Sequence, residues 1–513
     1  MKNYPIGIQT FEKIIKSDLL YIDKTREIHA LVHYGGYYFY ARPRRFGKSL
    51  MLSTIKAIYE GKKALFKGLW IEDQWDWSKT SPVIHFGFSG IGHRVIGLEK
   101  AIHQELDKLA EENEITLPDK DYVFKFKYLI EQVAKAKGKI ILLIDEYDKP
   151  IIDYLGKGIE QAERNRLTLK SFYSVVKDSD PYIEFLMITG VSKFSKVSIF
   201  SELNNLIDIT FHPRYLSLTG LTQTEIETHF TERIEEIAAE NGVTSTELKD
   251  KIRAWYNGYS WNTKLFVYNP FSILSYFDFG EFRNFWFETG TPTFLLDIMK
   301  QRGVIKINEL ESDDSVFSSY DIHRLEAIPL LFQTGYLTIK ARKDEYLYIL
   351  DYPNLEVRDS MLRHLIGTLR YEQKVFSRPM VLKVRDALRQ KDLEQLIRLI
   401  KSIFKNIPNQ IFHAEGEFYY HSLIYLVFFY LGDFIESEVN TNGGRLDAVV
   451  KTEQYIYLLE FKFNKNAQTA LQQIKKKGYA EKYYGDEREK VLLGINFSSE
   501  SKTVDDWTFE VVV

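Results

Sequence analysis

The chain has no cysteine and no long hydrophobic run. The lack of cysteine in its 513 residues excludes disulfides, thiolate zinc sites and a cysteine nucleophile, although it does not identify a compartment. The longest strongly apolar run, Leu423 to Leu431, is far shorter than the roughly 20 residues that cross a membrane. Met1 to Gly7 contain no apolar signal core. We therefore expect a cytoplasmic protein.

An excess of positive charge is also missing. The 68 Lys and Arg residues stand against 71 Asp and Glu residues, a net charge of -3, so nucleic acid can be bound only through local patches. No internal repeat, low-complexity segment or Gly/Ser-rich linker is evident. The composition is 45% hydrophobic and 15% aromatic, and a chain of this length is too long for one core, so we expect about two to four well-packed domains.

Two motifs in the first third of the sequence indicate its chemistry. The apolar segment Tyr37 to Tyr40 runs into Arg42-Pro43-Arg44-Arg45-Phe46-Gly47-Lys48-Ser49, and the apolar segment Ile140 to Ile144 runs into Asp145-Glu146. A strand that feeds a Gly-Lys-Ser turn, followed by a strand that ends in Asp-Glu, is typical of ATPases. The pair predicts a P-loop protein whose cofactors are ATP and Mg2+.

Each residue type in these motifs has a physical role. Backbone N–H groups of the turn and of the helix starting near Lys48 form an anion site, and Gly47 lets the backbone approach the nucleotide closely. Lys48 is expected to reach the terminal phosphates, and the Ser49 hydroxyl to bind magnesium. Asp145 is expected to hold that magnesium through water, and Glu146 to polarise the attacking water.

The loop departs from the usual pattern at its first position. The pattern G-x-x-x-x-G-K-[ST] has glycine where this chain has Arg42, so the loop must open in a different shape. Gly-Lys-Ser alone also fits an ordinary exposed turn between a strand and a helix, and the Asp-Glu strand favours the nucleotide site over that alternative. Arg44 and Arg45 are candidates for phosphate contacts, in cis or across a subunit interface. No arginine finger can be identified, and the oligomeric state stays open.

Alternation of strands and helices over residues 1–215 predicts an α/β fold with a doubly wound parallel sheet. The expected strands are Tyr37–Ala41, Pro82–Phe86, Ile140–Asp145, Ile183–Thr189 and Leu206–Phe211. The expected helices are Leu98–Glu112 and Tyr122–Lys135. The strand that ends at Thr189 should lie beside the Asp145 strand. Thr189 or Ser192 can then sense the γ-phosphate, and a hydroxyl that caps the next turn fits equally well. The expected nucleotide-binding residues are Arg44, Arg45, Phe46, Gly47, Lys48, Ser49, Asp145 and Thr189.

The pattern over residues 216–375 is mostly helical and suggests a lid and linker region. Its aromatic clusters, Trp255 to Tyr259 and Tyr268 to Phe271, combine turn-forming residues with large rings. Core packing is favoured for these rings over base stacking. A third domain is expected over residues 376–513.

A second acidic constellation lies near the C-terminus. Strand alternation puts Glu460 and Lys462 on one face of a strand. A hairpin that folds about residues 452–453 brings Asp447 opposite Leu458, one diagonal step from Glu460. Two carboxylates and a lysine then converge.

Glu417 is a candidate third carboxylate for the cluster of Asp447 and Glu460. Glu417 begins the apolar stretch 418–431, which we expect to form a buried helix. A cluster of Glu417, Asp447 and Glu460 can bind Mg2+, and the metal can activate water and neutralise a phosphodiester. Lys462 would position the water or stabilise developing charge. The spacing alone also fits a solvated hairpin with an ion pair, but charges within an apolar strand are costly unless paired or metal-bound.

These residues resemble those of the bacterial AAA-ATPase-like family that carries a C-terminal PD-(D/E)XK nuclease-superfamily domain. The resemblance covers nearly the whole chain, and the Arg-Pro-Arg-Arg-Phe-Gly-Lys-Ser string is its most specific part. The matching segments are Tyr21–Thr25, Ala41–Ser49, Ile144–Pro150, Trp255–Tyr259, Gly444–Asp447, Glu460–Lys462 and Ala470–Tyr479. In that family Arg42 is the normal residue of the loop.

The resemblance implies an ATP-binding domain and a restriction-endonuclease-like α/β domain with a helix, a mixed sheet and a second helix from about Asn466 to Tyr483. By similarity, the active-site positions are Glu417, Asp447, Glu460 and Lys462. Gln473 and Tyr479 fall on helix positions that related nucleases use beside the nucleic-acid backbone. The family motif begins with Pro-Asp, and Leu446 replaces the proline here, a common substitution.

The charge of the C-terminal part bears on DNA as a partner. From Ile411 to the end, 11 basic residues stand against 16 acidic ones, a net of -5 that opposes tight metal-free DNA binding. Lys475 to Lys477 fit a solvated helix face and a phosphate contact equally well. We expect an ATP-dependent or ATP-regulated nuclease that acts on DNA. The alternatives are a nucleotide-switched binding or signalling protein that recognises a partner without cutting, and an ATPase that remodels proteins.

Overall fold

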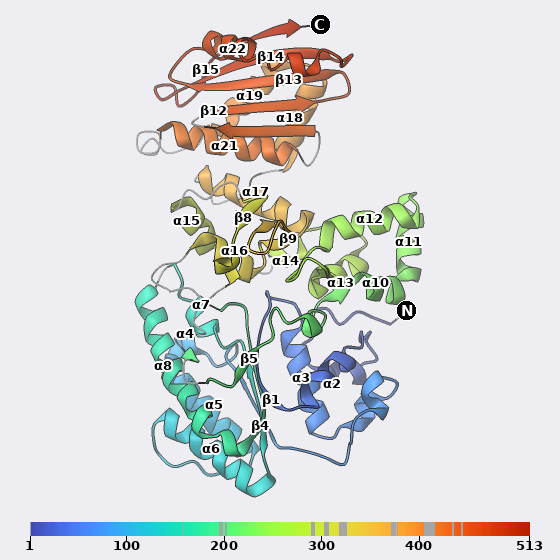
Figure 1. Ribbon diagram of the computed structural model, residues 1–513, viewed down its shortest axis with the longest axis vertical. Coiled ribbons are helices and arrows are strands. Elements are labelled where there is room, and N and C mark those ends of the chain that lie inside the picture. Colours follow the sequence, from blue (N-terminus) through green and yellow to red (C-terminus); the bar gives the residue numbers. More distant parts are fainter. Residues whose placement is uncertain are drawn as a thin grey trace. The chain divides into compact units, whose positions relative to one another are not determined.

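The computed structural model forms two compact units (Figure 1), each with its own sheet. The first unit comprises Met1–Ile298 and Lys306–Arg358, and the second comprises Met299–Ile305 and Asp359–Val513. The residues that the structure describes are 2–156, 158–193, 199–200, 203–288, 293–301, 307–317, 326–370, 376, 378–404, 416–432, 436–442 and 445–512. The expected boundaries at residues 215 and 375 lie inside these units, so the division into three domains stays a prediction.

The first unit contains a five-stranded sheet in the order β2-β3-β4-β1-β5, with every neighbouring pair parallel. The strands are β1 (Gly36–Ala41), β2 (Val83–Gly87), β3 (Ile140–Asp145), β4 (Ile183–Gly190) and β5 (Leu206–Asp208). The parallel α/β sheet is confirmed, and so is the placement of β4 beside β3. Because β4 lies between β1 and β3, the two nucleotide motifs emerge from strands separated by one neighbour.

Two apolar cores cover the two faces of this sheet. Tyr37 and Phe39 of β1 point into one core, whereas Tyr38 and Tyr40 point into the other, as strand alternation requires. The first core is closed mainly by α5, α6 and α8, and the second by α2 and α3 (Figure 1). The helices are α1 (Phe11–Lys16), α2 (Thr25–Val32), α3 (Lys48–Tyr59), α4 (His93–Ile96), α5 (Leu98–Glu112), α6 (Tyr122–Lys137), α7 (Lys149–Ile152) and α8 (Ile159–Asp178).

The segment after residue 215 is mostly helical, as expected, and adds two small antiparallel sheets with the strand orders β6-β7 and β8-β10-β9. Tyr256 and Tyr259 are fully buried, so core packing is confirmed for these two rings. The elements are α10 (Gln223–His229), α11 (Thr231–Asn241), α12 (Ser245–Tyr256), α13 (Pro270–Phe279), α14 (Phe285–Glu288), α15 (Thr293–Gln301), α16 (Ala327–Thr334), α17 (Leu355–Leu369), β6 (Leu221–Thr222), β7 (Val267–Tyr268), β8 (Leu310–Ser312), β9 (Thr338–Arg342) and β10 (Tyr348–Asp351).

The second unit is built on a mixed sheet in the order β11-β12-β13-β14-β15, in which only β13 and β14 are parallel. Phe461 on β13 packs against Phe428 of the apolar helix α21. The elements are α18 (Arg378–Arg389), α19 (Leu393–Phe404), α21 (Gly416–Leu431), α22 (Ala467–Lys476), β11 (Glu436–Asn442), β12 (Arg445–Lys451), β13 (Tyr455–Phe463), β14 (Glu489–Ser498) and β15 (Thr503–Val512). The mixed sheet expected for a nuclease-like domain is therefore present.

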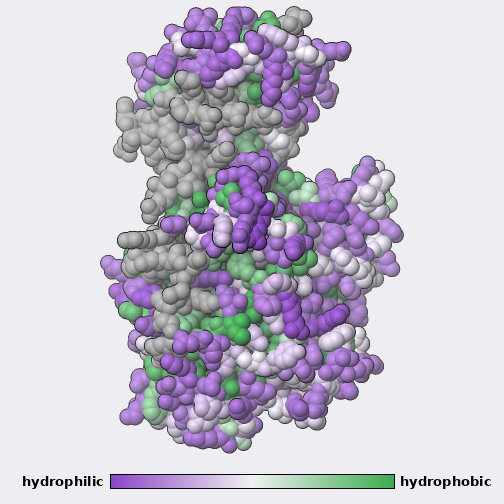
Figure 2. Space-filling model, viewed as in Figure 1, coloured by the Kyte–Doolittle hydropathy of each residue, from purple (hydrophilic) through white to green (hydrophobic). Residues whose placement is uncertain are grey.

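The surface in view is dominated by hydrophilic residues, with only small apolar areas between them (Figure 2). Within the described part of the chain, no helix is both long enough and apolar enough to cross a membrane.

Candidate functional site

The loop after β1 leads directly into the N-terminus of α3. Gly47 has a left-handed backbone, with φ at +88°, and precedes the first helical residue, Lys48. No side chain caps this helix end, so its first N–H groups are left for another acceptor. Ser49 lies in the same first turn. This local geometry suits an anion, because the exposed N–H groups and the helix dipole both favour negative charge.

The Lys48 side chain lies within the loop. Its Nζ donates to the carbonyl oxygens of Arg42, at 2.9 Å, and Pro43, at 3.0 Å. Burial lowers the pKa of the Lys48 amine, while the nearby carboxylates of Glu146 and Asp145 oppose that shift. Lys48 lines neither of the two clefts described below. To contact a phosphate, its amine must exchange the two loop carbonyls for phosphate oxygens.

Ser49 and Asp145 line one polar cleft with a volume of 490 Å3. The cleft is also lined by His85 on β2, by Lys56 on α3 and by Glu60, which follows α3 directly. A hydroxyl and a carboxylate at the ends of α3 and β3 fit the oxygen ligands that Mg2+ prefers. Among the described side chains, no three acidic or histidine residues gather as a metal cage. A metal held here would need further oxygens from a nucleotide or from water.

Thr189 connects β4 to the Asp-Glu end of β3. Its hydroxyl, which is fully buried, donates to Asp145 Oδ1 at 2.5 Å, and the backbone N–H of Glu146 donates to the same hydroxyl at 3.4 Å. Glu146 has a positive φ of 53°, and burial raises the pKa of its carboxyl group, opposed by the charge of Lys48. Thr189 therefore orients the two acidic residues expected to act on magnesium and water.

Ser192 has a different contact. Its hydroxyl and its backbone N–H both donate to Asp148 Oδ2, at 2.7 Å. Asp148 is almost fully buried, and burial raises the pKa of its carboxyl group. Of the two hydroxyls that the sequence suggests as phosphate sensors, Thr189 contacts the acidic pair and Ser192 holds a neighbouring turn. A sensor role for Thr189 stays a prediction.

Arg42 shapes the opening of the loop, which explains the missing glycine. Its guanidinium stacks over the rings of Trp261, at 3.8 Å, and Tyr40, at 4.4 Å. Its Nη1 donates to the carbonyl oxygens of Ala41 and Thr210. Arg42 is 1% exposed, so this side chain is a structural clamp.

The following residues of the loop are held by the helical segment. Phe46 is fully buried, with its ring 4.9 Å from that of Tyr259. Asn269 Nδ2 and Trp286 Nε1 both donate to the carbonyl oxygen of Arg44. Arg45 lies over the Phe271 ring at 5.0 Å. The backbone of Arg44 and the side chain of Arg45 thus contact polar and aromatic groups from residues beyond 215.

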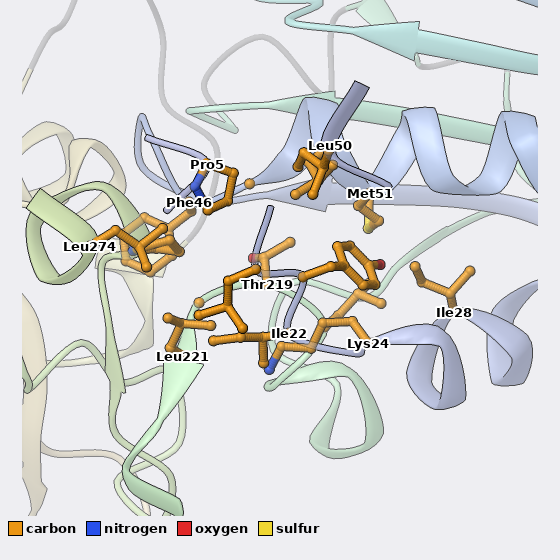
Figure 3. A pocket seen from close by; sticks show the side chains of 17 residues that line it. Pro5, Ile22, Lys24, Ile28, Phe46, Leu50, Met51, Thr219, Leu221 and Leu274 are labelled. Carbon is orange, nitrogen blue, oxygen red and sulfur yellow. The ribbon is translucent and has the colours of Figure 1, made fainter. Parts of the chain in front are cut away.

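An apolar pocket of 90 Å3 adjoins the other side of the loop (Figure 3). Its lining includes Ile22 from the N-terminal segment, Gly47 and Leu50 around the start of α3, and Leu221 and Leu274 from the helical segment. A cavity of about 150 Å3 can hold benzene, so a nucleotide base would enter this pocket only if its side chains moved apart.

The hairpin in the second unit has a different register from the one expected. Asp447 on β12 pairs directly with Glu460 on β13, and Leu458 pairs with Val449. The predicted pairing of Asp447 with Leu458 is wrong by two residues. The correction brings the two carboxylate positions closer, since directly opposed residues have Cβ atoms about 4.5–5.5 Å apart.

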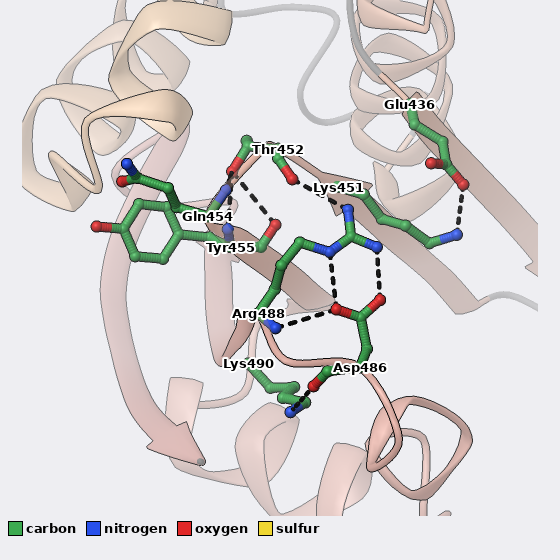
Figure 4. Close-up of polar contacts among 8 residues, drawn as sticks. All are labelled: Glu436, Lys451, Thr452, Gln454, Tyr455, Asp486, Arg488 and Lys490. Atoms are coloured by element: carbon green, nitrogen blue, oxygen red, sulfur yellow. Dashed lines mark hydrogen bonds and ion pairs between the residues drawn. The ribbon is translucent and has the colours of Figure 1, made fainter.

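The turn between β12 and β13 explains this register (Figure 4). Thr452 N donates to Tyr455 O at 2.8 Å, and the Thr452 hydroxyl accepts from the backbone of Gln454 and Tyr455. Arg488 donates to the Asp486 carboxylate through Nε and Nη2, and it donates to Thr452 O through Nη1 at 3.0 Å. The turn therefore spans four residues, which shifts the pairing relative to the tighter hairpin expected.

Glu460 and Lys462 lie on one face of β13, as alternation predicts. The Glu460 carboxylate is fully buried and pairs with Lys462 Nζ, and Lys462 is 7% exposed. The side chains of Glu417 and Asp447 lie outside the described part, although the backbones of α21 and β12 are described. A three-carboxylate metal site at this point therefore stays a prediction.

The helix after β13 is shorter than the resemblance implies. α22 ends at Lys476, and the Tyr479 ring packs onto the apolar cluster that contains Leu458 and Ile474. The prediction that Tyr479 lies on the helix is wrong, because this packing turns the chain back toward the sheet. Gln473 does lie on α22 and is half-buried, and its Nε2 has no hydrogen-bond partner among the described residues.

The lysines of this segment have local partners. Lys475 pairs with Glu510 on β15, and Lys477 Nζ donates to the Tyr479 hydroxyl at 2.6 Å. Lys476 is exposed. These contacts agree with a solvated helix face, and a role in phosphate contact stays a prediction.

Comparison with known proteins agrees with both halves of the chain. Residues 5–200 match the family model described as "Predicted AAA-ATPase", and residues 415–507 match that of the PD-(D/E)XK nuclease superfamily. A protein of Azotobacter chroococcum mcd 1, named "Uncharacterized protein in vnfD 5'region", is 39% identical over 527 residues and covers 99% of each chain. The chain belongs to this AAA-ATPase-like family with a C-terminal nuclease-superfamily domain. The resemblance inferred from the motifs is confirmed.

Several residues that shape the candidate nucleotide site were missed by sequence reasoning. Asn269 and Trp286 contact the loop from more than 220 positions away, and no local pattern indicates such a contact. Asp148 follows the Asp-Glu pair by two residues, and its place in the Ile144–Pro150 motif was the available signal.

Proposed function

We propose that this protein binds and hydrolyses ATP and that its nucleotide state controls a metal-dependent nuclease site acting on DNA. The observation that carries the proposal is that, in each unit, the fold places an expected metal-binding residue beside another. Asp145 shares a cleft with Ser49 in the first unit, and Asp447 pairs with Glu460 in the second. Each pair can offer oxygen ligands to a divalent cation.

The ATPase half has the local support of the loop geometry. The uncapped N-terminus of α3 suits the phosphates, and Ser49 with Asp145 suits a magnesium ion, which would neutralise charge on the phosphate oxygens. Glu146 is the proposed base that orients water. The raised pKa of its carboxyl group makes it a stronger proton acceptor than an ordinary glutamate once it is ionised.

The nuclease half is supported by the buried ion pair. Burying the charge of a glutamate or a lysine costs free energy unless the charge is paired. Glu460 and Lys462 are buried on β13 and pair with each other. A divalent metal bound by carboxylates can activate water and stabilise a phosphodiester under attack. In the proposed site Glu460, Asp447 and Glu417 bind the metal, and Lys462 positions the water.

The test measures ATP turnover and DNA cleavage with the same preparations. Linear and plasmid DNA are incubated with Mg2+ or Mn2+, with and without ATP. We expect Lys48→Ala to abolish ATP turnover and Lys462→Ala to abolish cleavage while leaving turnover intact. Lys465→Ala is the matched control, because it also replaces a lysine by alanine, three residues later in the turn that follows β13. This variant should cleave normally.

Two results would contradict the proposal. Absence of cleavage with every metal, with Lys462→Ala indistinguishable from the unchanged chain, removes the nuclease half. Cleavage that is equal with and without ATP removes the control by nucleotide.

A binding function without cleavage is the second candidate. The net charge of -5 from Ile411 to the end favours a partner that is not a polyanion. A nucleotide-switched signalling ATPase would show ATP turnover that responds to a protein partner and not to DNA. Turnover measured with DNA and with candidate proteins separates the two functions.

A further inference from the structure

A large open cleft in the first unit is not used by either site. It has a volume of 700 Å3 and lies between α12, β9, β10 and the start of α17. Asn257 and Gly258, the centre of the Trp-Tyr-Asn-Gly-Tyr motif, line it. The rings of this motif pack inward, as at Tyr256 and Tyr259, so the polar centre is left facing the cleft. The volume lies within the range of about 300–1,000 Å3 that small-molecule sites occupy.

The charge of this cleft is strongly one-sided. Its lining contains four basic side chains and a single carboxylate, in a protein whose overall charge is negative. The basic residues are Arg253, Lys264, Lys340 and Arg358, and the carboxylate is Asp351. Such a local excess produces a positive potential that attracts anions from solution.

Two of these cations have no carboxylate partner of their own. Neither Lys264 nor Lys340 forms an ion pair with a carboxylate of the described residues. Lys340 Nζ donates to Pro353 O at 2.6 Å, and burial lowers the pKa of its amine. Arg253, by contrast, lies 3.5 Å from Asp250 and is half-exposed. A half-buried amine that donates to a carbonyl, with the charge of Asp351 nearby, can gain a stronger, charged acceptor.

The end of the cleft adds neutral donors. Asn354 is 7% exposed, and its Oδ1 accepts from the backbone of Val357 in the first turn of α17. Its Nδ2 has no hydrogen-bond partner in the described part of the chain. A 15-residue helix that begins at the cleft contributes the positive end of its dipole. This arrangement adds donors and positive charge to a lining in which Asp351 is the single carboxylate.

Part of the lining is apolar. Leu265, Phe266 and Tyr352 all line the cleft. Phosphate groups suit the basic part, and a flat aromatic base suits the apolar part. Together the two parts match the chemistry of a nucleoside phosphate.

We propose that this cleft binds a nucleoside phosphate, as a free nucleotide or as a residue of a nucleic-acid strand, at a site separate from the ATP loop. The anion lies against Lys264 and Lys340, and the base lies against Phe266. The proposal does not depend on ATP hydrolysis or on DNA cleavage. It gives the Trp-Tyr-Asn-Gly-Tyr motif a binding role in addition to its role in the core.

The cleft is joined to the ATP loop by a short stretch of chain. Gly258 lines the cleft, and Tyr259, the next residue, packs against Phe46 of the loop. The test must therefore separate the two sites. The assay therefore uses full-length protein that carries Lys48→Ala, in a buffer that contains EDTA. The substitution removes the loop lysine, and EDTA removes the metal that cleavage would require.

The experiment measures fluorescence anisotropy with two probes, a labelled mononucleotide and a labelled ten-residue oligothymidylate. We expect Lys264→Gln with Lys340→Gln to weaken binding at least tenfold. For the oligothymidylate, each removed lysine should reduce the slope of the logarithm of the binding constant against the logarithm of the salt concentration by about 0.7. Lys100→Gln, which changes an exposed lysine on α5, is the matched control and should bind as the parent does.

Each outcome has a defined meaning. Binding of the mononucleotide alone assigns the cleft to a free nucleotide, and binding of the oligothymidylate assigns it to a strand. If neither probe binds, or if the double variant binds as tightly as the Lys100→Gln control, the proposal is wrong. Lys264→Gln alone, with rescue by Lys264→Arg, keeps the test decisive if the change at the half-buried Lys340 prevents folding.

Discussion

Replacing Thr189 by valine tests whether its hydroxyl positions Asp145 and Glu146, the acidic residues of the proposed ATPase site. Valine has nearly the same shape as threonine, so the change removes a hydroxyl without opening a cavity. Asp145 Oδ1 loses a donor at 2.5 Å, and the Glu146 N–H loses its acceptor at 3.4 Å. Because Thr189 is fully buried, the second methyl group of valine fills the place of the hydroxyl and no water can take that position, although Asp145 still lines the polar cleft.

The magnitude follows from the charge of the acceptor. Hydrogen bonds to charged groups contribute about 1.5–3 kcal/mol, and we expect a loss of that size in the free energy of unfolding of the first unit. For a unit of several hundred residues, this corresponds to a decrease of about 2–4 °C in the melting temperature. Thr189→Ser, the matched control, keeps the hydroxyl and loses one methyl group, a cost of about 0.8 kcal/mol.

The functional assay is ATP turnover as a function of magnesium concentration. If Thr189 orients Asp145, the valine variant will need more magnesium for half-maximal turnover, and the serine variant will not. If Thr189 instead senses the γ-phosphate, the maximal rate will fall at an unchanged magnesium requirement. Unfolding is followed by calorimetry in the same buffer.

Unchanged behaviour would refute this reasoning. The valine variant would then have the same melting temperature, magnesium requirement and maximal rate as the unchanged protein. Such a result would mean that the Thr189 hydroxyl contributes nothing to this site.

Three further outcomes are expected. Arg42→Gly, which restores the common glycine of the loop, should lower the free energy of unfolding by about 2–4 kcal/mol in urea titrations, because two carbonyls lose a charged donor while a buried charge is relieved. Gly258→Ala should cost about 3 kcal/mol or more by calorimetry, since the new Cβ would lie 1.9 Å from Pro353 O at a φ of +121°, whereas Gly485→Ala meets no atom within 4 Å and should be neutral. ATP turnover should be lost as pH falls through a pKa above the ordinary 4.5 of a glutamate, because Glu146 must be ionised to accept a proton and burial raises its pKa. A pH–rate profile measures this loss, and Glu146→Gln should abolish turnover at every pH.

The hairpin of the second unit shows where sequence reasoning reached its limit. Alternation correctly predicted that Glu460 and Lys462 share a face, because side chains on a strand alternate regardless of what surrounds it. The register was wrong by two residues because it depends on turn length. Arg488, 36 positions beyond Thr452, helps to hold the longer turn, and no local pattern contains that contact.

The amino-acid order by itself determined the five strands of the first sheet, their parallel arrangement and the two motifs, because periodicity and turn chemistry act over a few neighbouring residues. Only the tertiary structure decided that Arg42 is a buried clamp, that Thr189 bonds to Asp145 and that a basic cleft surrounds Asn257. These features bring together side chains from distant segments. Their energies come from burial and mutual contact, which exist only after the chain has folded.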